Sequence, residues 1–358
     1  MDNSKTGKKK TRSRKKKATE SFMSRNAMVI FIAALAVIIF GGAAAMFLFE
    51  GYGGDDRPRI TIGRDADNAE VKRQLTGECG TAFGTKVYEL WRLQGGDAAK
   101  AHGSYCVEPG ESAVKLARRM AKGRQTPVSL TFNNIRTIDQ LAERLSRQLE
   151  LGPDEVKAAM ETLLPAKGFD KAAFPAAFLP DTYEVYWTVS GTELVEKLSS
   201  ERSRFWNDER HAKARKLGLT PVEVATIASI VEEETSRRDE MGKVARLYLN
   251  RVGRKMKLQA DPTVKFAIGD FSIRRITATM LRTSSPYNTY MAPGLPPGPI
   301  RVAAASTIDA VLDAPAHNYL YMCAKEDFSG YHNFASDYAT HQANARRYQA
   351  ELDRRNIH

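Results

Sequence analysis

The strongest hydrophobic pattern lies near the N-terminus, where residues 27–49 form an apolar run without a charged side chain. At about 1.5 Å per residue, a helix of this length exceeds the roughly 30 Å hydrocarbon core of a bilayer. Residues 1–25 carry ten Lys or Arg, whereas acidic residues follow the run. This asymmetry predicts one membrane-spanning helix with the N-terminus in the cytoplasm. The alternative is a cleaved signal peptide, for which residues 43–45 supply small side chains, although the run is longer than a usual signal core.

A second pattern, with the 3.6-residue period of a helix, covers residues 220–240. Thr220 is placed to cap this helix, and Pro221 suits its first position. Glu223 stands three residues after the cap and completes a capping box. The pattern therefore predicts a helix that starts at Pro221 and runs into three consecutive glutamates.

Helical geometry distinguishes one of these glutamates from the other two. Side chains placed at about 100° per residue put Glu234 in the middle of an apolar face, which consists of Val224, Ile227, Ile230 and Val231. Glu232 and Glu233 point away from that face on either side. A carboxylate on an apolar face is costly to ionise, so its pKa rises towards the range that a general acid needs. The alternative is a frayed last turn with Glu234 exposed to solvent.

The remaining pattern alternates short strands with helices, which predicts the α+β class. It divides the chain into a basic tail (1–26), the membrane span (27–49), a stem with a small βα module (50–132), a helical connecting region (133–216) and a candidate catalytic domain (217–358). In the βα module, residues 104–132 follow one another as strand, turn at Pro109-Gly110, helix and strand. This order resembles a LysM-like module, a small fold that holds N-acetylated glycans. A plain packing or spacer domain is the alternative.

Charge and cysteine content narrow the functional classes. The net charge is +12, but the tail supplies about +8 of it, and it has neither interleaved aromatic residues nor a nucleic-acid motif. We therefore expect contact with anionic lipid headgroups rather than nucleic acid. The three cysteines, Cys79, Cys106 and Cys323, form no CxxC or Cys/His cluster, so no metal or other cofactor is expected. Cys79 and Cys106 could form a bridge in an oxidising compartment.

The C-terminal third contains residues suited to a sugar site. Aromatic faces pack on pyranose rings, and amides bond hydroxyl and N-acetyl groups. Prolines around such a loop reduce the entropy lost on binding. The candidates for holding a substrate are Gln259, Asp261, Tyr287, Asn288, Tyr290 and His332. The alternative for the two tyrosines is packing on the core, and for the histidine a structural role.

Taken together, the motifs resemble the YceG-like family of endolytic murein transglycosylases over nearly the whole chain. The resemblance rests on the strings ASIVEEET, LQADPTV, and SPYNTY with GLPPGPI, and on the spacing of His332 and His341. In that family the catalytic glutamate precedes the threonine of the helix motif, which implies Glu234 before Thr235. The chain departs from the family at Ala260, where threonine is usual.

The resemblance implies endolytic cleavage of nascent peptidoglycan at the MurNAc-β-1,4-GlcNAc bond, without water and with 1,6-anhydroMurNAc ends. Glu234 would act first as acid and then as base. The implied location is the inner membrane, with a single span and the catalytic domain on the periplasmic side. The implied partners are glycan strands, the cytoplasmic membrane and peptidoglycan synthases.

Two other functions stay open at this point. A hydrolytic muramidase would use Glu234 with Asp261, because glycosidases generally place two carboxylates about 5 to 9.5 Å apart. Asp261 could equally cap a helix that begins at Pro262. A non-catalytic cell-wall-binding scaffold for a synthase would tolerate the loss of Glu234.

Overall fold

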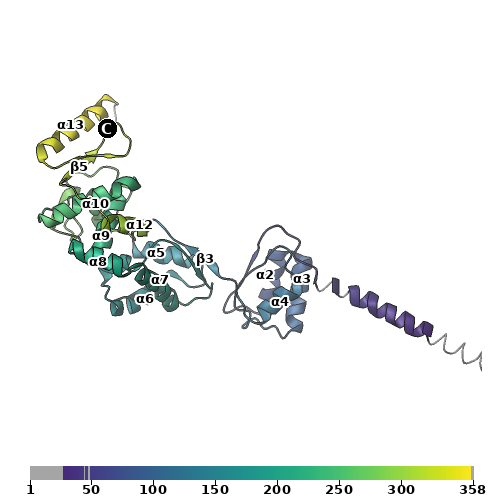
Figure 1. Cartoon of the computed structure of the whole chain (residues 1–358). Coiled ribbons are helices and arrows are strands. Elements are labelled where there is room, and N and C mark those ends of the chain that lie inside the picture. Colours follow the sequence, from purple (N-terminus) through teal and green to yellow (C-terminus); the bar gives the residue numbers. More distant parts are fainter. Residues whose placement is uncertain (1–26, 44, 47–48, 356–358) are drawn as a thin grey trace, which may run out of the picture. The chain divides into compact units, whose positions relative to one another are not determined.

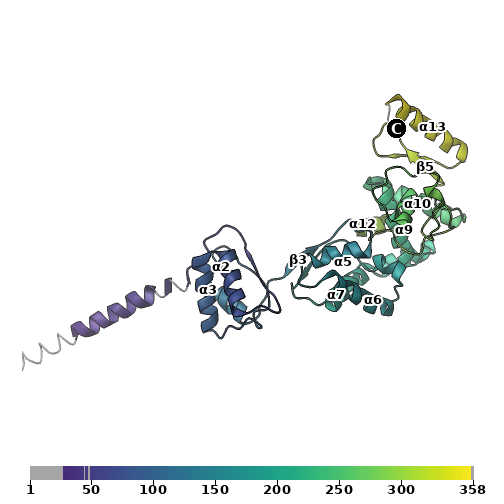
Figure 2. The ribbon, with the colours of Figure 1, turned by 180° about the vertical axis from the view of Figure 1, so that it is seen from behind.

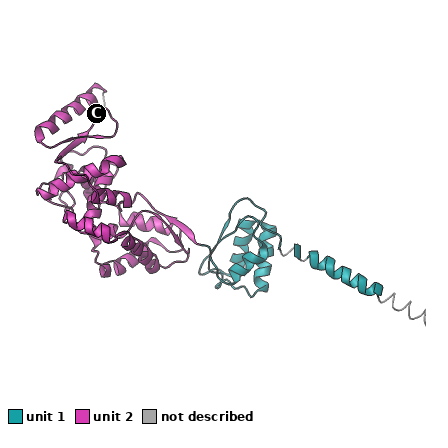
Figure 3. Cartoon of the chain, in the orientation of Figure 1, with its two compact units in different colours: residues 1–126 teal, residues 127–358 magenta. Residues whose placement is uncertain are grey.

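The computed structural model describes residues 27–43, 45–46 and 49–355, so the predicted basic tail, residues 1–26, lies outside the described residues. The chain separates into two compact units, residues 1–126 and residues 127–358, which Figure 3 shows in different colours. The two units contain both helices and antiparallel strands, as the α+β prediction requires.

The predicted membrane span is only partly described. Residues 27–43 are helical, and this helix is seen from opposite sides in Figure 1 and Figure 2. Of the helices in the described part of the chain, none combines the length and the apolar character that a membrane crossing needs. The span also includes residues 44, 47 and 48, which are not described, and the anchor stays a prediction.

The first unit builds its core between three helices and a two-stranded sheet. Strand β1 (Arg59–Ile62) pairs with β2 (Gly103–Cys106) in antiparallel register. The helices are α2 (Asn68–Cys79), α3 (Thr81–Leu93) and α4 (Ala113–Ala121). Trp91, Tyr105 and Leu116 are fully buried among them.

The last strand expected for the βα module belongs to the second unit. This strand, β3 (Val128–Thr131), pairs with β4 (Thr182–Val185) about fifty residues further along the chain. Its burial alternates because Val128 and Leu130 face the core of the second unit while Ser129 faces solvent. The predicted order of strand, turn, helix and strand over residues 104–132 is confirmed, but the last strand pairs within the second unit, and no LysM-like module is shown.

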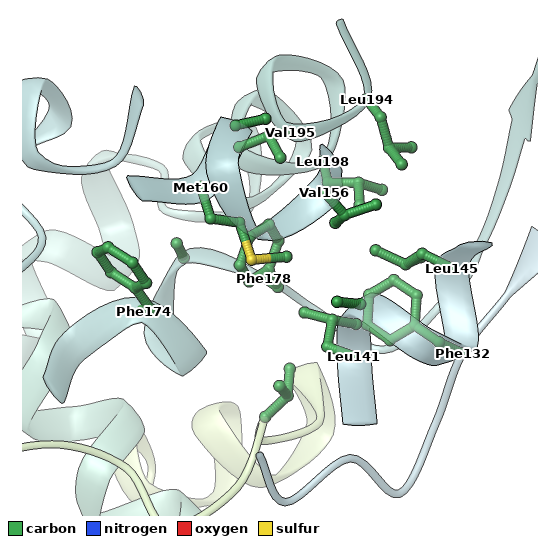
Figure 4. Close-up of a cluster of buried hydrophobic side chains, with 14 of the residues drawn as sticks. Phe132, Leu141, Leu145, Val156, Met160, Phe174, Phe178, Leu194, Val195 and Leu198 are labelled. Carbon is green, nitrogen blue, oxygen red and sulfur yellow. The ribbon is translucent and has the colours of Figure 1, made fainter. Parts of the chain in front are cut away.

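Figure 4 shows the first of two cores in the second unit. Helices α5 (Ile138–Ser146), α6 (Pro153–Leu163) and α7 (Gly191–Phe205) contribute side chains to it together with β3 and β4. The rings of Phe132 and Tyr183 stack there with centroids 5.7 Å apart. Two short 3-10 helices, η1 (Pro165–Lys167) and η2 (Lys171–Ala177), connect α6 to β4.

Helix α9 (Pro221–Glu234) is the centre of the second core. The predicted capping box is confirmed: Thr220 Oγ1 accepts from the Glu223 N–H at 3.2 Å, and the Glu223 carboxylate accepts from the Thr220 N–H at 2.7 Å. Every residue from Val224 to Val231 is buried. These eight residues of the helix are therefore enclosed on all sides, and the expectation of a single apolar face was too narrow for them.

The elements around α9 complete the unit. They are α8 (Asp208–Leu217), α10 (Arg238–Gly253), α11 (Asp261–Ile268), η3 (Met280–Arg282) and α12 (Ala305–Leu312). After them, β5 (Tyr321–Ala324) and β6 (His332–Ala335) form an antiparallel pair, and α13 (Tyr338–Arg354) packs on both strands.

The Pro- and Gly-rich loop before α12 joins the two cores. Gly298 has no room for a side chain, because a Cβ atom would lie 1.9 Å from the carbonyl oxygen of Ala172 in η2. Beyond it, the Ile300 N–H donates to Ser229 Oγ on α9 at 3.0 Å, and the Val302 N–H donates to the carbonyl of Ile135 at 2.8 Å. These contacts fix α9 against the first core.

Candidate active site

A cleft of about 270 Å³ lies at the C-terminal end of α9. Its walls come from the end of α9, one side of α10, the segment that leads into α11, the loop that follows η3 and carries Tyr290, and strands β5 and β6. Five of the residues singled out in the sequence line it, namely Glu234, Gln259, Asp261, Tyr290 and His332. Tyr287 and Asn288 do not.

Glu234 is the last residue of α9 and is partly buried at the wall of the cleft. The hydroxyl of Tyr248 on α10 donates to its Oε1 at 2.7 Å. Burial raises the pKa of Glu234 to about 7, against the lowering effect of the Tyr248 hydrogen bond, and the charge of Asp261 raises it further. A carboxyl with this pKa exists in both protonation states near neutral pH, as a residue that both gives and takes a proton must.

The two preceding glutamates are held by ion pairs outside the cleft. Glu233 lies 2.9 Å from Arg136 Nε and 2.8 Å from Arg301 Nη1. Glu232 pairs with Arg301 Nη2 at 3.2 Å and accepts from the Ala304 N–H at 2.9 Å. No such pair involves Glu234 within the part of the chain that the structure describes. Of the three glutamates, it is therefore the one that keeps a carboxyl available to a ligand.

Asp261 stands at the first position of α11, not before it. The helix cap is Ala260, without a side-chain capping bond, so the expectation that Asp261 caps a helix starting at Pro262 was wrong. Its Oδ1 instead accepts from the Tyr290 hydroxyl at 2.7 Å. The structure thus brings a second carboxylate to the cleft and fixes it with an aromatic residue of the neighbouring loop.

Gln259 adopts a left-handed backbone conformation, with φ of 50°, which is uncommon for a residue other than glycine. The loop that contains Thr289 holds it there, because the Gln259 N–H donates to the Thr289 carbonyl at 3.2 Å. The Ala260 N–H also donates to Thr289 Oγ1 at 3.0 Å. Such strained residues are often found at binding sites.

His332 begins β6 and is oriented by a buried carboxylate. Its Nδ1 lies 2.8 Å from Glu240 Oε2, and its backbone N–H donates to Glu240 Oε1 at 2.9 Å. Glu240 is only 6% exposed. Pairing at Nδ1 leaves Nε2 as the ring nitrogen that can bond a ligand in the cleft.

Tyr287 and Asn288 organise the loop that carries Tyr290. Asn288 is fully buried: its amide donates to the carbonyls of Leu281 and Thr283, and its oxygen accepts from the Tyr290 N–H. The Tyr287 ring packs on Phe266, with centroids 4.7 Å apart. In this structure neither side chain faces the cleft.

Sequence reasoning missed Tyr248 and Arg251, both of which line the cleft from α10. A charged residue at an apolar helix position, the signal that singled out Glu234, is present for Arg251 as well. Arg251 continues the buried stripe of Val244 and Tyr248 at helical spacing, and a charged residue on such a stripe indicates a special environment. The contact between Tyr248 and Glu234 depends on how α9 and α10 pack, which no local pattern encodes.

The cysteines and acidic residues offer no metal site within the described residues. Cys79, Cys106 and Cys323 are unpaired, so the bridge considered for the first two is not formed in this structure. Cys323 lies in β5 at the edge of the cleft, and burial raises the pKa of its thiol.

Comparisons with known proteins agree with the resemblance seen in the motifs. Residues 60–347 match the YceG-like family. An endolytic murein transglycosylase of Bacillus subtilis is 33% identical over 148 residues, which cover 41% of each chain. One of Streptococcus pneumoniae is 25% identical over 254 residues, which cover 62% of this chain and 46% of the relative. The chain thus spans less than half the length of these curated relatives.

A solved structure supports the same fold. A YceG-like protein of Listeria monocytogenes, 22% identical, superposes with a TM-score of 0.54 over 81% of this chain and 99% of that chain. At this level of identity the likeness concerns the fold alone. Since the family match covers most of the chain, the chain belongs to the YceG-like family.

Proposed function

We propose that the chain is an endolytic murein transglycosylase. It cuts the β-1,4 bond between N-acetylmuramic acid and N-acetylglucosamine within a glycan strand and leaves a 1,6-anhydro end. The observation that carries this proposal is a cleft carboxyl, Glu234, with a pKa of about 7 and no paired cation among the described residues. The names of the Bacillus and Streptococcus relatives support the reaction and the substrate.

In the proposed mechanism Glu234 first acts as a general acid. It gives its proton to the glycosidic oxygen as the bond from that oxygen to C1 of the muramyl sugar breaks. As a carboxylate it then takes the proton of the C6 hydroxyl of the same sugar, whose oxygen forms the new bond to C1. Glu234 ends protonated again, and the reaction consumes no water. A second catalytic carboxylate is therefore not needed.

The other residues of the cleft are proposed to hold the strand. The strand would meet the amide of Gln259, the phenol ring of Tyr290 and a ring nitrogen of His332. The carboxylate of Asp261 adds a hydrogen-bond acceptor. Tyr287 and Asn288 contribute by fixing the conformation of the loop that carries Tyr290.

A membrane anchor would place this reaction beside newly made glycan. The apolar run of residues 27–49, preceded by the basic tail, supports a single span with the catalytic unit outside the cytoplasm. Synthases that polymerise glycan at the same surface are the partners that such a position favours.

The proposed function is tested with the intact chain in detergent and purified long glycan strands. Endolytic cleavage predicts that the mean strand length falls early, with intermediate lengths present before disaccharides accumulate. Immediate release of disaccharides would indicate attack from strand ends. Binding without any shortening would support the scaffold function instead.

The hydrogen bond from Tyr248 gives a pH prediction. Because this bond lowers the pKa of Glu234, Tyr248→Phe is expected to raise that pKa above its wild-type value of about 7. The acid form then persists to higher pH, and the alkaline limb of the pH dependence of kcat/KM moves upward. Tyr183→Phe is the matched control, since its hydroxyl bonds the Leu179 carbonyl outside the cleft, and it should keep the wild-type profile. Equal profiles for wild type and Tyr248→Phe would contradict the proposed role of this bond.

A further inference from the structure

Arg251 is a buried cation beside the proposed catalytic acid. It is 7% exposed, yet it lines the cleft from the same helix as Tyr248. Its Nε donates to the Leu320 carbonyl at 2.6 Å, and its Nη1 donates to the Leu258 carbonyl at 2.6 Å. Weaker Nη1 contacts reach the carbonyl of Lys257 and the side-chain oxygen of Gln259. All four acceptors are neutral.

The second terminal nitrogen of Arg251, Nη2, makes no hydrogen bond to any residue that the structure describes. No carboxylate in the described part of the chain forms an ion pair with this guanidinium. Arg301 is equally buried, at 7% exposed, but is matched by both Glu232 and Glu233. A buried charge is costly unless it is paired, and of these two buried arginines Arg251 is the one without a carboxylate partner among the described residues.

The guanidinium is also held in a fixed orientation. Two short bonds to backbone carbonyls fix its Nε and Nη1, and the ring of Tyr321 lies 5.4 Å from its central carbon. A fixed guanidinium loses little entropy when it binds a planar anion. Inside the cleft, Asp261 is engaged by Tyr290 and Glu234 by Tyr248, which leaves the free edge of Arg251 for a ligand.

We propose that Arg251 binds a carboxylate of the glycan strand next to the bond that is cut. This inference rests on the proposed function and specifies which part of the substrate the cleft recognises. A strand has two sources of carboxylate. One is the lactyl group of a muramyl sugar without a peptide, and the other is the peptide of a muramyl sugar that carries one. A charge-assisted hydrogen bond to either favours the anionic strand.

The test compares matched strands on the intact wild-type chain. Denuded strands and peptide-bearing strands are each used untreated and after conversion of their carboxylates to methyl amides. Amidation is expected to raise KM and the dissociation constant about tenfold or more. An effect confined to denuded strands assigns the lactyl carboxylate, and an effect confined to peptide-bearing strands assigns the peptide. Equal KM and equal binding for amidated and untreated strands would overturn the inference.

A variant then assigns the effect to the residue. Arg251→Gln is expected to bind amidated and untreated strands equally. Arg202→Gln is the control, because Arg202 also bonds a carbonyl, that of Ala176, and packs on Trp206 away from the cleft. It should keep the wild-type discrimination. If no strand is cleaved, the proposed function fails. The role of Arg251 is still tested in that case, because the dissociation constants of amidated and untreated strands can be compared without cleavage. Charge discrimination that survives in Arg251→Gln would refute the assignment.

Discussion

Glu234→Gln is expected to lower the rate of strand cleavage by about 10²- to 10⁴-fold, the usual contribution of a general acid–base group. Glutamine keeps the size of the side chain and can still contact Tyr248, but it cannot give a proton to the glycosidic oxygen. The measurement is the rate at which new strand ends appear at pH 6 to 7. Glu232→Gln is the matched control, because that residue is paired with Arg301 outside the cleft. Wild-type rates in Glu234→Gln would remove Glu234 from the mechanism.

A second readout separates this loss from misfolding. In the folded protein the pKa of Glu234 is raised from 4.5 to about 7, so its contribution to stability is complete below pH 4.5 and is lost as the pH rises through 7. Glutamine stays neutral throughout. The variant is therefore expected to match wild type at low pH and to exceed its unfolding free energy above pH 7, by up to about 3 kcal/mol. Urea unfolding at several pH values measures the difference.

Arg301→Met is expected to cost about 3 to 5 kcal/mol of unfolding free energy, the effect of removing one partner from a buried ion pair. The side chain of Arg301 is 9% exposed, and it neutralises Glu232 and Glu233 together. Its loss leaves Glu232 without a cation and Glu233 with Arg136 alone. Urea unfolding of the intact chain, followed in the second unit, measures the loss.

Two further variants show whether the ion pairs cause this cost. Arg136→Met removes a more exposed partner, with a side chain that is 29% exposed, and should cost only about 1 kcal/mol. Adding Glu232→Gln to Arg301→Met should recover part of the stability, because one unpaired carboxylate is then neutral. A double variant no more stable than Arg301→Met would show that packing, and not charge, accounts for the loss.

The part of the site predicted from the sequence is the part that local signals encode. The capping box at Thr220 and the apolar run after it determine where α9 starts, and thereby place Glu234 at its end. The strings around Gln259 and Tyr290 were grouped by composition, and the structure brings those two residues to the cleft. Composition could not separate a ligand-facing residue from a loop-holding one. The amide of Asn288 could bind a ligand or hold the loop. Its buried hydrogen bonds to two loop carbonyls show that it holds the loop.

The features that the sequence does not predict depend instead on contacts between distant parts of the chain. Strand β3 directly follows the first unit, yet its partner β4 lies beyond two helices. A strand pattern does not specify its partner. The ion pairs of Glu233 with Arg136 and Arg301 likewise join residues 97 and 68 positions apart. These ion pairs leave Glu234 as the one of the three glutamates without a paired cation among the described residues. The helical pattern also singles out Glu234, but because it places that residue on the apolar face.

The most direct test of the account is the chemical nature of the new strand ends. Purified glycan strands are incubated with the intact wild-type chain in water enriched in heavy oxygen, and the products are analysed by mass spectrometry. The account predicts anhydro ends, each lighter by one water than a reducing end and free of solvent oxygen. Reducing ends that contain the heavy oxygen would contradict it and would indicate a hydrolase in which Asp261 serves as the second carboxylate.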